Sequence, residues 1–186
     1  MTEPENSTRR FRIDARRGSF DVRAFAEGWL SFVGHNPTFA VRKYGGEVNF
    51  AAGNPDSILL VVQADSLSLI DKVSEKDRAE IENAMREKVL ETRKFPKIVF
   101  VSRYVSMKEI SNGRFLATAR GNLTLHGESR RQTIKAEAEI GGETIRAGGE
   151  FTLKPSDFNI EQFKALGGTL KVKDEVKISF DITAQT

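Results

Sequence analysis

The feature that most constrains this chain is an alternation of apolar and polar residues near its C-terminal end. The apolar positions are Val176, Ile178, Phe180, Ile182 and Ala184, and the residues between them are polar or charged. A period of two residues places all the apolar side chains on one face of an extended strand. The segment therefore predicts a β-strand with one buried face and one solvent-exposed face.

The same alternation recurs along much of the chain. The segments that show it are residues 20–24, 48–50, 115–119, 123–125, 132–140 and 145–153. Gly45-Gly46 and Gly141-Gly142 predict turns between strands, and Gly121-Asn122 predicts a break within one. These segments indicate a chain built mainly from short antiparallel strands.

Two further segments are continuous apolar runs, residues 57–62 and 97–101. Such runs are typical of strands that are covered on both faces. With them the total comes to about eight strands, and an antiparallel sheet of that size removes its edges only by closing on itself. The sequence therefore predicts a mainly β fold, a closed antiparallel eight-stranded β-barrel.

One segment follows helical spacing instead. Its apolar residues are Ile81, Ala84, Met85 and Val89. Ser74 with Asp77 resembles a capping box, and Glu82 with Arg86 forms a favourable i,i+4 pair. We expect one amphipathic α-helix at about residues 74–91, with its apolar side packed on the barrel. The alternative is that this side meets a protein partner.

Length and composition bound the remaining possibilities. A chain of 186 residues suits one domain, which we place at residues 9–186 after a flexible tail at 1–8. The 29 basic and 26 acidic residues are interleaved, so nucleic-acid binding is not expected. Cysteine is absent, which excludes disulfides and thiolate chemistry. The N-terminus is polar and does not resemble a signal peptide, so a cytoplasmic location is expected.

Phenylalanine is unusually frequent, with 13 Phe against one Trp and two Tyr. An eight-stranded barrel is just wide enough to be filled by side chains or to hold one slender ligand. The residues expected to line the interior are Phe20, Val22, Phe32, Phe39, Val48, Phe50, Phe100, Leu123, Phe151, Leu153, Phe158, Ile178 and Phe180. Whether they leave space or fill it, as in an accessory barrel with a solid core, stays open.

Several motifs occur in an order that resembles the YceI-like family of lipocalin-like, polyisoprenoid-binding barrels. Residues 121–127 (Gly-Asn-Leu-Thr-Leu-His-Gly) are similar to the family's G-x-L-T-[LI]-H-G. Residues 95–102 and 156–160 are similar to its Y-P-x-I-x-F-x-S and S-D-F-G-I segments, with Asn159 in place of the usual Gly. The resemblance implies a lipocalin-like barrel that holds a polyisoprenoid or an isoprenoid quinone.

His35 and His126 are the only histidines. His35 falls where the family usually has a histidine, and near the barrel mouth it would meet a lipid headgroup. In its turn context His126 is expected to bond a turn carbonyl. An enzyme of undetermined reaction that uses either histidine, with or without a metal, is the alternative.

The leading hypothesis from the sequence is non-enzymatic binding, storage or transport of a long apolar lipid. It implies no catalytic residues, no metal and no cofactor besides the bound lipid. Arg9-Arg10, Arg16-Arg17 and Arg130-Arg131 are candidates for transient contact with an anionic membrane surface. Formation of a homodimer is left open.

Overall fold

The computed structural model of the chain describes residues 8–27, 36–162, 164–165 and 170–186, so residues 1–7 of the expected tail lie outside it. The strands are β1 (Arg9–Glu27), β2 (Thr38–Val41), β3 (Tyr44–Ala51), β4 (Asn54–Gln63), β5 (Leu67–Leu69), β6 (Lys97–Ser111), β7 (Arg114–Leu125), β8 (Glu128–Gly141), β9 (Thr144–Leu153), β10 (Lys164–Ala165) and β11 (Leu170–Gln185). The helical segments are α1 (Glu75–Ala84), a π-helical turn at Met85–Val89, and two 3₁₀ turns, Ala64–Ser66 and Pro155–Phe158.

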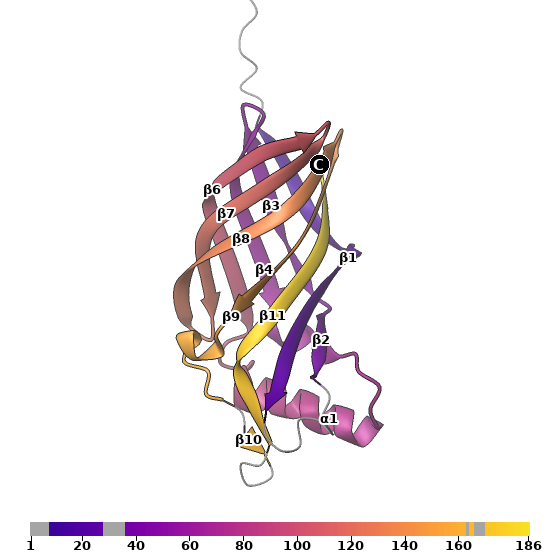
Figure 1. The fold of residues 1–186 in the computed structure, drawn as a ribbon, viewed down its shortest axis with the longest axis vertical. Helices are drawn as coiled ribbons and strands as arrows, with labels where there is room; N and C mark the ends of the chain where they lie inside the picture. The colour runs from indigo at the N-terminus through magenta and orange to yellow at the C-terminus, as the bar shows by residue number, and fades with distance from the viewer. Residues whose placement is uncertain (1–7, 28–35, 163, 166–169) are drawn as a thin grey trace, which may run out of the picture.

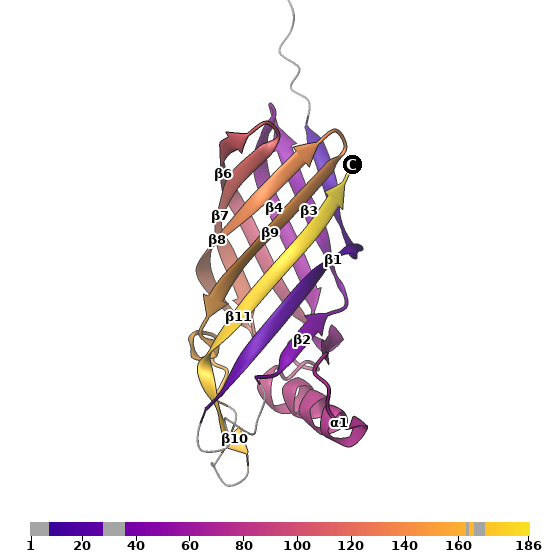
Figure 2. The same ribbon diagram turned by 45° about the vertical axis from the view of Figure 1, so that its right-hand side comes forward.

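Antiparallel pairing runs continuously around a barrel (Figures 1 and 2). The strand order is β11-β9-β8-β7-β6-β4-β3-β1, and pairing of β1 with β11 closes it. In that seam Phe20 lies opposite Phe180 and Val22 opposite Ile178. The predicted closed barrel with one helix is therefore confirmed. The strands β2, β5 and β10 are additions at the end where α1 lies, which we call the helix end; the opposite end is the hairpin end.

The course of β1 determines why these additions form. Its first residues pair with β3, but residues 15–18 then bulge out opposite the single residue Ile182. Beyond the bulge, residues 21–23 pair with β2 instead of β3, and β2 pairs in turn with β5. The bulge thus turns β1 away from β3 and lets a small extra sheet extend the wall at the helix end.

Helix α1 protects the edge of that extra sheet. The Ser74 hydroxyl oxygen accepts the backbone N–H of Asp77 and so caps the helix. The Glu82 carboxylate accepts the backbone N–H of Leu69 in β5 at 2.9 Å, and Arg78 donates to the Leu69 carbonyl. The expected helix is confirmed, and its side chains occupy backbone groups that an exposed edge strand would otherwise present.

Two expectations about glycines are wrong. Gly45 and Gly46 were expected to form a turn, but both lie within β3, paired with Val61 and Leu60. Residues 121–122 were expected to break a strand, but β7 runs through them without interruption. The reason at Gly121 is close approach, because a Cβ there would collide with the Val101 carbonyl and the Phe100 ring. Gly46 and Gly121 thus permit close packing within strands and do not mark their ends.

The expectation that residues 57–62 and 97–101 are covered on both faces is also wrong. Leu59 and Val101 lie opposite each other on β4 and β6 and are 36% and 41% exposed. Their neighbours Leu60 and Phe100 point into the barrel, because side chains alternate along a strand. No described element covers the outside of these two strands. The apolar runs of β4 and β6 therefore give these strands an apolar outer surface as well as an apolar inner one.

Three clusters of buried side chains fill the barrel at different heights. One at the helix end contains Phe39, Leu69 and Met85. A second, which includes Phe100 and Phe158, lies against the Pro155–Phe158 turn. The third, with Phe11 and Phe50, lies toward the hairpin end. The interior is therefore packed at its two ends, which leaves the middle as the place for a cavity.

We predict that Gly121→Ala destabilises the barrel by about 1–3 kcal/mol, the usual range for overpacking. The added methyl would overlap the Val101 carbonyl, which is held by the β6–β7 pairing. Gly45→Ala is the matched control, because a Cβ at Gly45 meets nothing within 4 Å. Urea unfolding of both variants measures the difference, and equal free energies of unfolding would contradict the close-approach argument.

Candidate ligand-binding site

The candidate site is a cavity inside the barrel, between the packed clusters. Its volume is about 160 Å³, and every described residue that lines it is apolar. No described ionisable side chain reaches its wall. A space of this kind excludes water and favours hydrocarbon, but it presents no group that could act as an acid, a base or a nucleophile.

Small side chains on three neighbouring strands create the space. Ala117 and Ala136 face each other across β7 and β8, and Ala138 faces Ala147 across β8 and β9. All four line the cavity. The remaining walls carry large side chains, among them the Phe20, Phe50 and Phe100 rings. The cavity therefore exists because one side of the barrel interior is lined by methyl groups.

The structure brings together only part of the lining expected from the sequence. The expected residues that do line the cavity are Phe20, Val48, Phe50, Phe100, Leu123, Phe151 and Phe180. Those that do not are Val22, Phe39, Leu153, Phe158 and Ile178. Phe32 and His35 lie outside the described residues.

The five residues away from the lining point inward but lie nearer the helix end. Val22 and Phe39 belong to the packing around Met85, and Leu153 and Phe158 to the cluster that contains Phe100. Ile178 is buried opposite Val22. Alternation predicts the face on which a side chain lies but not its height along the barrel. We correct their assignment from cavity wall to the cores that close it.

Sequence reasoning missed the alanines, together with Val105 and Met107 of β6. The signal was present in the alternation, since Ala136, Ala138 and Ala147 occupy inward positions of predicted strands. Without the strand register, nothing in the sequence shows that small residues of different strands adjoin. The lining expected from the sequence contained only large apolar residues, although the small residues produce the space.

His126 has a structural environment away from the cavity. Its Nε2 is 2.7 Å from a Glu91 carboxylate oxygen, and its Nδ1 is 3.3 Å from the Phe158 carbonyl oxygen. The Phe95 ring packs on the imidazole at 4.3 Å between centroids. The histidine thus ties the β7–β8 turn to the segment after the helix and to the Pro155–Phe158 turn. It bonds a turn carbonyl, as its sequence context suggested.

Among the described residues, no group of three or more His, Asp or Glu side chains could hold a metal ion. Of the helices in the described ranges, none has the length and apolar character to cross a membrane.

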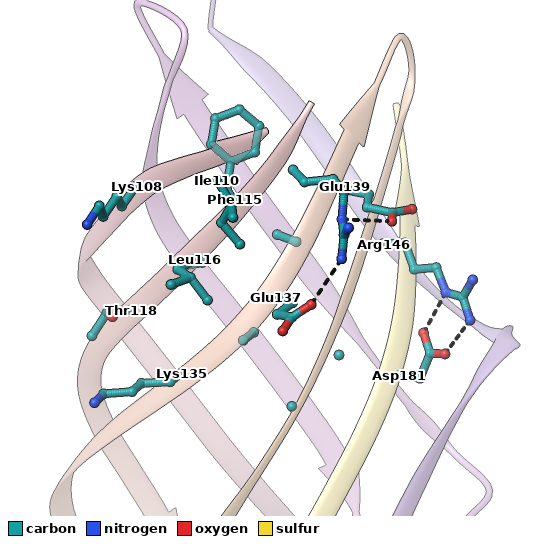
Figure 3. Close-up of a pocket in the computed structure, with 16 residues that line it drawn as sticks. Lys108, Ile110, Phe115, Leu116, Thr118, Lys135, Glu137, Glu139, Arg146 and Asp181 are labelled. Carbon is teal, nitrogen blue, oxygen red and sulfur yellow. Dashed lines mark hydrogen bonds and ion pairs between the residues drawn. The ribbon is translucent and has the colours of Figure 1, made fainter. Parts of the chain in front are cut away.

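A larger hollow of about 720 Å³ lies on the outside of the barrel, over β7, β8 and β9 (Figure 3). Some of its charged side chains form ion pairs: Arg114 lies 3.3 Å from Glu137 and 3.5 Å from Glu139. Arg146 hydrogen-bonds Asp181 at 2.5 Å and so lowers the pKa of that carboxyl. Seven of its sixteen lining residues are charged, whereas every described residue that lines the interior cavity is apolar, so the interior cavity is the better candidate for an apolar ligand.

Tyr44 places one polar atom beside the interior. Its ring meets the Phe20 ring edge to face at 5.5 Å, and its hydroxyl is buried with no hydrogen-bond partner among the described residues. Burial raises the pKa of this phenol, and the nearby carboxylates Asp14, Asp181 and Asp21 raise it further. The hydroxyl therefore stays neutral, and burying it unpaired costs stability.

We predict that Tyr44→Phe raises the free energy of unfolding by about 1 kcal/mol, because it removes a buried unpaired hydroxyl without removing the ring. Thermal or urea unfolding of the two proteins is the measurement. Phe20→Leu is the control for lost ring contact and should destabilise. A less stable Tyr44→Phe protein would show that the hydroxyl is satisfied in solution.

Comparison with known proteins agrees with this architecture. The sequence pattern of the YceI-like domain matches residues 3–184. A UPF0312 protein of Pseudomonas savastanoi pv. phaseolicola is 30% identical over 165 residues, which cover 85% of this chain and 80% of that protein. A UPF0312 protein of Pseudomonas putida is 28% identical over 161 residues, covering 83% and 80%.

Solved structures share the fold at low sequence identity. Burkholderia cenocepacia BcnA superposes with a TM-score of 0.70 at 18% identity, covering 93% of this chain and 99% of that one. A polyisoprenoid binding domain from Saccharophagus degradans, implicated in plant cell wall breakdown, also gives 0.70, at 13% identity and with 95% and 98% covered. With the sequence match over nearly its whole length, this chain belongs to the YceI-like family.

Proposed function

We propose that this protein binds a long apolar lipid of the isoprenoid class inside its barrel, and stores or carries it without changing it chemically. The observation that carries the proposal is the cavity whose described lining is wholly apolar. A hydrocarbon chain that enters such a space gains about 25 cal/mol for each Å² removed from water. Affinity then depends on chain length more than on polar contacts.

The ligand class is supported by the family and by its structural neighbours. One neighbour of the same fold is described as a polyisoprenoid binding domain. Branched isoprene units suit a wall that mixes methyl groups with phenyl rings, because both surfaces are apolar and irregular.

The size of the cavity sets a condition on binding. About 160 Å³ is close to an engineered cavity of about 150 Å³ that holds benzene, and pockets for larger ligands span about 300–1,000 Å³. A long hydrocarbon ligand can therefore enter only if interior side chains change rotamer and enlarge the cavity. Met107 and the Phe rings at the wall are the movable parts, whereas the alanines are fixed to the backbone. Binding reshapes packing inside a fixed barrel.

The alternatives have less support. An enzyme that uses His126 would have to break its contacts with Glu91 and Phe158. An accessory barrel that docks a partner through its helix would expose Met85, yet Met85 is buried in the helix-end cluster.

The direct test is to purify the protein from cells, extract it with organic solvent and analyse the extract by mass spectrometry. We expect about one long-chain isoprenoid per chain. Protein that arrives empty and also fails to take up added polyprenol or isoprenoid quinone would refute the proposal. Elemental analysis of the same sample tests the alternative, since one bound zinc or iron per chain would favour an enzyme.

We predict that Ala136→Leu weakens lipid binding by about fiftyfold. The larger side chain takes space worth about three methylene groups of ligand burial, at about 0.8 kcal/mol each. Thr133→Leu is the matched control, because it adds a leucine to the exposed face of the same strand. Titration with a fluorescent isoprenoid analogue gives both affinities, and equal affinities would exclude the cavity as the binding site.

A further inference from the structure

The outer surface of β6, β7 and β8 carries a concentration of positive charge. These strands contain eight basic and four acidic residues, an excess larger than the net charge of +3 of the whole chain. The basic residues that point to solvent without an ion pair among the described residues are Lys97, Arg103, Lys108, Arg120, Arg131 and Lys135. We call this surface the basic wall.

The three acidic residues of β8 do little to offset that charge, which leaves Glu109 of β6 as the fourth acidic residue of these strands. Glu137 and Glu139, labelled in Figure 3, both pair with Arg114, and Glu128 pairs with Arg130 at 3.1 Å. In the same view Lys108 and Lys135 extend away from these pairs. The basic wall therefore faces solvent with its positive charges largely uncompensated.

Exposed apolar side chains gather on the same wall. Tyr104 is 77% exposed, Ile110 53%, Leu116 48% and Val101 41%, and all four lie on β6 or β7. Strand register mixes them with the charges, because Lys108 lies opposite Leu116 and Arg120 opposite Tyr104. Exposed apolar residues that are grouped in this way mark an interaction surface.

We propose that the basic wall docks on the surface of an anionic lipid bilayer. Each Lys or Arg near such a surface gains electrostatic energy, and aliphatic and aromatic side chains gain by entering the headgroup region. A nucleic acid would satisfy the charges but would leave Leu116, Ile110 and Val101 in water. The docking surface lies outside the barrel, so this inference goes beyond lipid binding in the interior and does not depend on it.

The test is co-sedimentation with vesicles of phosphatidylcholine alone or of equal parts phosphatidylcholine and phosphatidylglycerol. We expect binding to the anionic vesicles only, weakened by salt. The double variant Lys108→Ala with Arg120→Ala should bind about 25-fold more weakly, about fivefold for each charge removed. The matched control is Arg12→Ala with Lys173→Ala, which removes the same charge from β1 and β11 across the barrel.

A second pair of variants tests the apolar part. Leu116 and Ile70 are equally exposed, at 48% and 47%, but only Leu116 lies on the basic wall. Leu116→Ser should weaken vesicle binding, and Ile70→Ser should leave it unchanged. The proposal is overturned if either pair of variants behaves alike, if no binding to anionic vesicles occurs, or if duplex DNA binds through the wall while vesicles do not.

Lipid binding in the interior and membrane docking by the basic wall can be tested separately. Ala136→Leu protein, which should lose interior lipid, is expected to sediment with anionic vesicles as the wild type does. Loss of sedimentation in that variant, although it is folded and its wall is intact, would show that the bound lipid and not the basic wall mediates the contact.

Discussion

The pairing of β1 with β11 is the constraint on which the rest of the structure depends. These strands come from the two ends of the chain, and their ladder converts an open sheet into a barrel. An open sheet would have to bury its apolar face against another layer, and α1 is too short to serve as one. Closure lets the sheet bury its own face and separates an interior from water. Without this seam there is no dry space for a ligand.

Closure also explains where the cavity lies. The number of strands sets the diameter of a β-barrel, and eight strands leave a narrow interior. The free volume inside therefore depends on the size of the side chains that point inward. Phenylalanines fill the two ends, while alanines of β7, β8 and β9 leave the middle unfilled. The His126 contacts hold the turn whose Phe158 closes one end. The rigid wall and the adjustable packing are thus supplied by different residues.

Period-two alternation was sufficient to predict the strands, the closed barrel and the inward faces, because side-chain direction is a local property of extended backbone. The height of each residue was not predictable, since it depends on register across strands distant in sequence. Phe158 and Phe39 were expected at the cavity and instead close it. Gly46 was expected in a turn and Gly121 at a strand break, yet each lies within a strand and permits close packing there. The continuous apolar runs were misinterpreted, because a strand buried on both faces and a strand with an exposed apolar outer face have the same run of apolar residues.

The apolar outer face of β4 and β6 has a functional consequence. A strand covered on both faces would have needed a layer outside the barrel, and none of the described elements supplies one over β4, β6 and β7. Exposed apolar side chains that are grouped on a surface are unfavourable in water, and such groups mark sites of interaction with another molecule or a membrane. On β6 and β7 they alternate with unpaired basic residues, and Leu59 of β4 adjoins Val101. Because alternation assigns neighbouring residues to opposite faces, β6 and β7 each contribute to a dry interior and to an outer face suited to a bilayer.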